Sequence, residues 1–187
     1  AEADGGVTVP LPGFGDVNGT CGVLDDTVWL SSEPWLFRNT LDLDSLTWDA
    51  SALSPGGQRI WLTPNLGGSS EHSEVFAYEA LYRCELAEVL ATEAEVVYDD
   101  PNGTKTDLLV SIDGRKVGVS VVRAYHYPPE TTYELDQAYA KLHEKCSDIL
   151  VSAANAAPEN AWERSILAVI AYDAAHADVY EQAYAML

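Results

Sequence analysis

The fold is decided by the stretch Lys105-Thr106-Asp107-Leu108-Leu109-Val110-Ser111-Ile112-Asp113-Gly114, followed closely by Val117-Gly118-Val119-Ser120-Val121-Val122-Arg123-Ala124. Aliphatic and β-branched residues dominate both parts, and this composition is typical of strands. Asp113-Gly114 lies between them and favours a two-residue turn. The stretch therefore predicts strands over residues 106–112 and 117–124, joined by a tight hairpin that suits a pairing of Asp107 with Ser120.

Helical spacing precedes this hairpin. Val75, Tyr78 and Tyr82 recur at intervals of three and four, and Ser70 is a suitable N-cap. We expect a helix over about residues 71–92. A further strand over 95–98 then leads into the turn Asp99-Asp100-Pro101-Asn102-Gly103, which makes the middle of the chain a three-strand meander.

Alternating element types continue after the hairpin. Thr132 is expected to cap a helix that runs to about Lys145. Residues 148–153 and 165–172 are predicted as strands, the second so apolar that we expect it to be buried on both faces. A last helix over about 174–187 completes the order helix, three-strand meander, helix, two strands, helix, which predicts an α/β fold.

The first part of the chain has a different character. Residues 1–70 hold many prolines and glycines and only short apolar pieces, so an irregular conformation is expected. Four of the five tryptophans also lie here, and disordered segments are poor in aromatic residues. We therefore predict an N-terminal arm, residues 1–70, packed on an α/β domain of residues 71–187.

Charge limits the classes of partner. The chain of 187 residues has a formal net charge of −20, which opposes nonspecific attraction to nucleic acid backbones. Eight of the ten basic residues fall between Arg83 and Arg164, so a local site for nucleic acid stays open beside a protein partner. No apolar run approaches the roughly 18 residues of a membrane helix, and we expect no membrane association.

The cysteines and the start of the chain leave the compartment open. Cys21, Cys84 and Cys146 show no CxxC or CxxH spacing, which argues against structural zinc. Reduced, buried cysteines are the simpler expectation, with one disulfide, such as Cys84 to Cys146, as the alternative. A basic and apolar leader is absent, which slightly favours an intracellular location over secretion. The oligomeric state is open.

The element order and the two central strands resemble the PD-(D/E)XK superfamily, whose core is restriction-endonuclease-like. Members carry an Asp early on the second strand and a Glu-x-Lys or Asp-x-Lys motif on the third. The strand containing Asp107 looks like the first of these, and the strand from Val117 to Ala124 looks like the second. The resemblance covers about residues 70–173. It implies the corresponding α/β core, and in active members a phosphodiesterase site that uses Mg²⁺ or Mn²⁺.

This chain departs from the motif at two positions. Ser120 stands where the resemblance places a metal-binding carboxylate, and Val122 stands where it places the lysine. A divalent metal ion in such a site needs hard oxygen ligands, mainly carboxylates, to activate water and neutralise phosphate charge. A hydroxyl is a weaker ligand and valine offers none. The residues thus favour a divergent, catalytically degenerate branch that needs no cofactor.

Neighbouring groups offer a route to retained activity, because this superfamily moves catalytic groups between nearby positions of the fold. Glu79 lies near the predicted inward face of the first helix, where many members carry another acid. Asp99 or Asp100 is a candidate third carboxylate, and Arg123 or Lys116 is a candidate phosphate contact. The alternative is that Glu79 lies at the edge of an apolar face and that the aspartates only form the turn.

Three hypotheses follow. The first is a degenerate nuclease-like domain that serves as a binding or scaffolding module, with Asp107 and Ser120 at its centre. The second is an active metal-dependent nuclease that uses Asp107, Glu79 and Asp99, with Arg123 near phosphate. The third is a secreted acidic interaction protein. Motifs for zinc hydrolases and phosphate-binding loops are missing from the sequence.

Overall fold

The computed structural model describes residues 14–43, 49–64, 71–124 and 132–187. Its strands and helices follow one another along the chain as β1 Asp16–Gly19, α1 Asp26–Leu30, β2 Asn39–Asp42, the short 3-10 helix η1 Ala50–Ala52, α2 Pro55–Leu62, α3 Glu71–Glu85, β3 Glu88–Thr92, β4 Leu108–Ile112, β5 Arg115–Ala124, α4 Leu135–Asn155, β6 Arg164–Ala171 and α5 Ala174–Tyr184. The chain therefore has a mixed α/β fold.

The main sheet has four strands in the order β3-β4-β5-β6. β3, β4 and β5 form the antiparallel meander that the sequence predicts, and β6 runs parallel to β5 after the α4 crossover. At the β4–β5 turn, Asp113 and Gly114 have φ angles of 51° and 76°. Both values lie in the left-handed region that such hairpin turns require, so the Asp-Gly prediction is confirmed.

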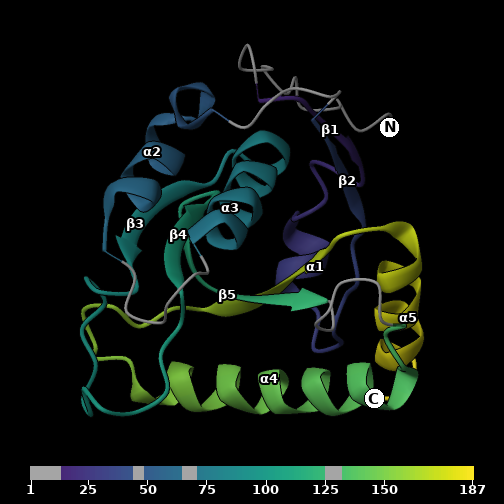
Figure 1. The fold of residues 1–187 in the computed structure, drawn as a ribbon. Helices are drawn as coiled ribbons and strands as arrows, with labels where there is room; N and C mark the ends of the chain where they lie inside the picture. Colours follow the sequence, from purple (N-terminus) through teal and green to yellow (C-terminus); the bar gives the residue numbers. More distant parts are fainter. Residues whose placement is uncertain (1–13, 44–48, 65–70, 125–131) are drawn as a thin grey trace.

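Helices cover both faces of the sheet. Figure 1 shows α3 above the sheet and α4 beneath it, with α5 at one end of the lower layer. The upper core joins Val75 and Tyr78 of α3 to Val110 and Val119 of the sheet. The lower core joins Leu142 of α4 and Tyr180 of α5 to the opposite side of β5 and β6. Strand alternation thus divides the sheet residues between two apolar layers.

The first helix is shorter than predicted. α3 ends at Glu85, and Leu86 adopts a φ angle of 53° that leads into β3. The prediction of helix to residue 92 and strand over 95–98 is therefore wrong, because the strand lies at Glu88–Thr92. Tyr98 makes only an isolated bridge to Ala156. The prediction ran past Leu86 because apolar residues before and after it continue the spacing that is typical of a helix.

The second helix is longer than predicted. α4 continues from Leu135 to Asn155, so the strand expected over 148–153 is wrong. It begins after Glu134 instead of Thr132, and the Gln137 side chain accepts a hydrogen bond from the Glu134 N–H. β6 and α5 are present as predicted. The side chains of β6 are half-buried instead of fully buried, because in the described chain this strand pairs only with β5.

The described part of the arm holds more regular structure than its composition predicts. Asp25 accepts hydrogen bonds from the first turn of α1, and Ser54 accepts one at the start of α2, where Pro55 takes the first helical position. Arm residues complete the upper core, and these are Phe14, Leu24, Trp29, Leu53 and Ile60. The arm is therefore packed into the α3 side of the sheet.

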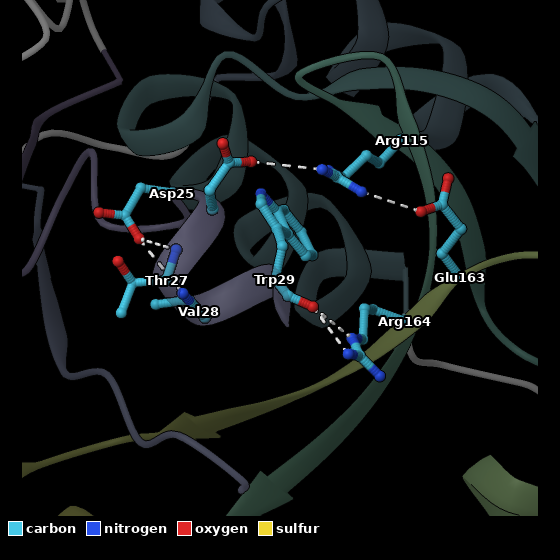
Figure 2. Close-up of polar contacts among 8 residues, drawn as sticks. Asp25, Thr27, Val28, Trp29, Arg115, Glu163 and Arg164 are labelled. Carbon is cyan, nitrogen blue, oxygen red and sulfur yellow. Dashed lines mark hydrogen bonds and ion pairs between the residues drawn. The ribbon is translucent and has the colours of Figure 1, made fainter. Parts of the chain in front are cut away.

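Two arginines hold α1 against the sheet. Figure 2 shows Trp29 between Arg115 of β5 and Arg164 of β6. Arg164 donates two hydrogen bonds to the Trp29 carbonyl, at 3.0 and 2.7 Å. Arg115 bridges Asp26 and Glu163. Basic side chains near the start of these strands thus bind the arm.

A disulfide joins Cys21 to Cys84, and Cys146 is the free thiol. This pairing corrects the expectation of three reduced cysteines and also the alternative of Cys84 with Cys146. The two partners are 63 positions apart, and only the packing of the arm on the end of α3 brings them together. Within the ranges described above, every helix is too short or too polar to cross a lipid bilayer.

Candidate functional site

Asp107 and Ser120 lie opposite each other where β4 begins. Leu108 pairs with Val119, so the preceding Asp107 lies opposite Ser120. Thr92 pairs with Leu108, so Glu93 follows β3 on the other side of Asp107. The register brings the two acids and the serine into one row across three strands, as the sequence predicts for Asp107 and Ser120.

The Asp107 carboxylate continues the hydrogen bonding of the sheet past the end of β4. Its backbone N–H donates to the Val119 carbonyl at 3.1 Å. Its Oδ2 atom accepts a hydrogen bond from the Val121 N–H at 2.7 Å. A side-chain oxygen of Asp107 therefore takes the place of the backbone carbonyl that a longer β4 would supply. The hydrogen bond from Val121 holds this oxygen in position.

Ser120 is buried, with 9% of its surface exposed. Its Oγ atom lies 3.4 Å from Thr106 Oγ1. The Thr106 hydroxyl donates to the Val119 carbonyl at 2.9 Å, so its single proton is already used. Ser120 is therefore the donor in the contact with Thr106, and each of the two hydroxyls has a hydrogen-bond partner within the chain.

A pocket of about 270 Å³ opens beside this row. We call it the Asp107 pocket; its lining residues are Glu93, Gly103, Thr104, Lys105, Asp107, Ser120, Val121, Lys145 and Asp148. The last two come from α4, where Lys145 Nζ lies 3.3 Å from an Asp148 oxygen. Loop, strand and helix thus surround one small cavity that carries both signs of charge.

Burial raises the pKa of Asp107 from 3.8 to about 7. The hydrogen bond from Val121 opposes this rise, while the negative charges of Glu74 and Glu93 add to it. Lys145 lowers the pKa, but by less than these other effects. A carboxyl group that is desolvated and surrounded mainly by acids holds its proton up to neutral pH.

Glu79 lies in a different part of the molecule. It is fully buried on α3, where it accepts hydrogen bonds from the Ser54 N–H and hydroxyl at 2.8 and 2.6 Å. Arg83 Nε lies 3.5 Å from its other oxygen. These contacts tie α3 to the start of α2, and Glu79 does not line the Asp107 pocket.

The other predicted site residues are also apart from the pocket. Asp99 and Asp100 are exposed, and both backbone N–H groups bond to Asn155. Arg123 is three positions after Ser120 on β5, so its side chain points to the opposite face. Lys116 donates to the Glu159 carbonyl at 2.7 Å. Of the predicted residues, the structure brings together only Asp107 and Ser120.

Three lining residues were missed because of the wrong element boundaries. Glu93 is the acid at the end of the first strand of the meander, a position that the sequence analysis gave to Asp99. Lys145 and Asp148 lie three residues apart on α4, where the sequence placed a helix end and a strand. A helix continued through 148 would have put both side chains on one face.

The positions that the motif resemblance singles out offer few ligands for a divalent metal ion. Asp107 already has one oxygen bound to Val121, Ser120 is neutral, and Val122 offers no ligand atom. Among the residues that the structure describes, no three His, Cys, Asp or Glu side chains are grouped so that they could hold a metal. Mg²⁺ is usually held by one or two carboxylates together with several waters, and of the motif positions only Asp107 carries a carboxylate.

Comparison with known proteins finds a relative whose name states no activity. The chain is 36% identical over 138 residues to the AAC-rich mRNA clone AAC4 protein of Dictyostelium discoideum. The match covers 71% of this chain but 20% of that protein, so the chain spans about a fifth of the length of this relative. No protein-family model and no solved structure matches the chain.

Proposed function

We propose that this chain is a PD-(D/E)XK-like domain that has lost metal-dependent catalysis and acts as a binding module for a protein partner. The order α3, β3-β4-β5, α4 and β6 supports the nuclease-like core, because it follows the order of that superfamily. The position of Asp107 at the start of the second strand of the meander supports it further.

The contacts of the Asp107 carboxylate carry the functional part of the proposal. In the row of this acid, the partner position holds Ser120 instead of a carboxylate. Val122, two residues later on the same face, is buried and replaces the lysine. The strand retains the shape of such a site, while the groups that would bind a metal ion and stabilise phosphate charge are missing.

Charge favours a protein partner over nucleic acid. Oxygens of the same chain already accept hydrogen bonds from most of the basic side chains, namely Arg38, Arg59, Arg83, Arg115, Lys116, Lys141, Lys145 and Arg164. A phosphate backbone would have to displace these contacts while approaching a chain of net charge −20. A basic protein surface meets no such repulsion.

A nuclease assay with Mg²⁺ or Mn²⁺ tests the loss of catalysis. We expect no cleavage of single-stranded or double-stranded DNA or RNA above the background of the Asp107→Ala variant. Metal-dependent cleavage that disappears in Asp107→Ala and persists in the matched variant Asp113→Ala would overturn the proposal. It would favour instead an active nuclease with relocated ligands, centred on Asp107 and Glu93.

The Cys21–Cys84 disulfide favours a second candidate, a secreted acidic interaction protein. Disulfides persist mainly in oxidising compartments. Alkylation of the protein in its native source, followed by mass spectrometry, tests this candidate. Protection of Cys21 and Cys84 with labelling of Cys146 would support it, and labelling of all three thiols would contradict it.

A further inference from the structure

Two asparagines lie in the sequence motif that N-linked glycosylation uses. Asn18-Gly19-Thr20 and Asn102-Gly103-Thr104 both match Asn-x-Ser/Thr, with a middle residue that is not proline. Chance matches to so short a motif are common, so the sequence alone does not assign a modification. Two independent features of the structure bear on it, namely the contacts of the asparagine amides and the pairing of the cysteines.

The motif asparagines differ from the other asparagines that the structure describes. Asparagines outside the motif have side chains that hydrogen bond to the backbone, and these are Asn39, Asn155 and Asn160. The side chains of Asn18 and Asn102 are exposed, and neither has a hydrogen-bond partner among the described residues. The fold thus uses the amides outside the motif and leaves free the two that the motif marks.

Both motifs lie at places where the surface has room for a covalent group. Asn18 is on β1, opposite Thr40 of β2. Asn102 is in the turn after β3, where the Gly103 N–H donates to the Asp100 carbonyl at 3.1 Å. Figure 1 shows β1 at the upper right and the teal loop after β3 at the lower left. A glycan on either exposed amide displaces no contact of the fold, and the two sites are independent of each other.

The Cys21–Cys84 disulfide supplies the second observation. Disulfides form and persist in oxidising compartments, among them the lumen of the endoplasmic reticulum, where N-linked glycosylation takes place. The disulfide and the free amides therefore point to the same compartment by separate routes. The inference below rests on the secreted candidate and goes beyond the proposed binding function.

We propose that Asn18 and Asn102 are sites of N-linked glycosylation. The donor is an oligosaccharide joined to a lipid through pyrophosphate, and a transferase catalyses the reaction. A bond forms between Nδ2 of the asparagine and the anomeric carbon of the first sugar, while the bond from that carbon to pyrophosphate breaks. The amide loses one proton, the lipid pyrophosphate leaves with the electron pair, and nothing is oxidised or reduced.

A tryptic digest of the protein from its native source tests the modification together with its premise. Trypsin cleaves after Lys and Arg, so without reduction the peptide that ends at Arg38 stays linked to peptide 84–105 through the disulfide. This linked species carries both Asn18 and Asn102. We expect mass spectrometry to find a glycan on each asparagine. A peptide amidase should then remove both glycans and leave aspartate at each site.

Peptide 146–164 of the same digest is the matched control. It holds Asn155 and Asn160 outside any motif, and it also holds the free Cys146. Alkylation before digestion should label its thiol, and its asparagines should stay unmodified. A sample without amidase controls for spontaneous deamidation of the Asn-Gly pairs.

Variants of the motif threonines separate motif-directed transfer from other modifications of an exposed amide. Thr104→Ala should remove the glycan from Asn102 and retain that on Asn18, whereas Thr104→Ser should retain both. Thr20→Ala should remove only the glycan on Asn18. The asparagines themselves are unchanged in these variants, and circular dichroism checks that each one folds.

Unmodified asparagines would overturn the inference, and the cysteines show what else fails. Unmodified asparagines in the disulfide-linked species overturn the glycosylation alone. If Cys21 and Cys84 are alkylated as well, the secreted candidate fails with it. A glycan at one asparagine supports that site and overturns the other. These outcomes are distinct from failure of the proposed function, which appears as Asp107-dependent cleavage in the nuclease assay.

Discussion

Two carboxyl groups on opposite faces of the main sheet, the fully buried Glu79 and the half-buried Asp107, behave differently. Glu79, on the α3 face, receives two hydrogen bonds from Ser54 and lies beside the buried Arg83. Asp107, on the α4 face, receives one hydrogen bond from Val121 and opens onto a pocket. The chain compensates the first charge and leaves the second poorly compensated. Glu79 therefore ties together elements of the core, whereas Asp107 faces a pocket with fewer compensating groups.

Removing the Glu79 carboxylate, which is the compensated one, should change the free energy of unfolding most. Glu79→Ala leaves Arg83 buried without its partner and removes the acceptor of both Ser54 hydrogen bonds. We expect a loss of about 3–5 kcal/mol in the free energy of unfolding. Urea denaturation measures this change.

The matched control is Glu144→Ala, which removes an exposed acid on α4. Its effect should stay within about 0.5 kcal/mol. A loss below about 1 kcal/mol for Glu79→Ala would break the comparison, because it would show that the Glu79 cluster contributes little to stability.

Neutralising Asp107, the poorly compensated carboxylate, should increase the free energy of unfolding, whereas removing Glu79 should decrease it. The pKa of Asp107 is about 7 in the folded protein and 3.8 in a free side chain. The folded state therefore binds a proton more tightly, and stability falls as the pH rises from about 4 to 7 and then levels off. Asp107→Asn should thus stabilise the protein by about 4 kcal/mol at pH 8 and hardly change it at pH 4.

Denaturation curves of the wild type and Asp107→Asn at pH 4, 6 and 8 check this expectation. Asp113→Asn, at the exposed turn, is the control and should show no comparable pH-dependent gain. A variant less stable than the wild type at pH 8 would mean that the ionised carboxylate of Asp107 contributes to stability, as that of Glu79 does.

The smallest effect concerns Lys145, a basic residue of the pocket lining. Lys145 lowers the pKa of Asp107 through space, while its own ion pair is with Asp148. Lys145→Gln should raise the pKa of Asp107 by about 0.5 and change stability by no more than about 0.5 kcal/mol. Titration of the Asp107 carboxyl carbon by NMR measures the pKa. A rise of about 2 would show that Lys145 compensates Asp107 as closely as Arg83 compensates Glu79.

Some of the fold could be predicted because its signals are local. The Asp113-Gly114 turn fixes the hairpin, since these residues accept positive φ angles, and the hairpin fixes the pairing of Asp107 with Ser120. The replacements at Ser120 and Val122 are likewise read directly from the strand. The α/β class follows from the alternation of element types.

Boundaries and partners required the tertiary structure. The residues around Leu86 fit a helical period, and only packing on the sheet shows that β3 begins after it. Because the predicted strand was placed too late in the chain, Asp99 was taken as the acid at its end, whereas the structure has Glu93 there. The shortened prediction for α4 likewise separated Lys145 from Asp148.

The sequence by itself determined the hairpin and the pairing of Asp107 with Ser120, because turn preference and strand alternation act over a few neighbouring positions. Only the tertiary structure decided which carboxylate is compensated. Ser54 meets Glu79 because the arm packs on α3, whereas Lys145 lies near Asp107 because α4 crosses beneath β5. Arg83 reaches Glu79 through local helix spacing, but the burial of Glu79 and its bonds from Ser54 depend on groups far apart in the chain, and no local pattern encodes their distance.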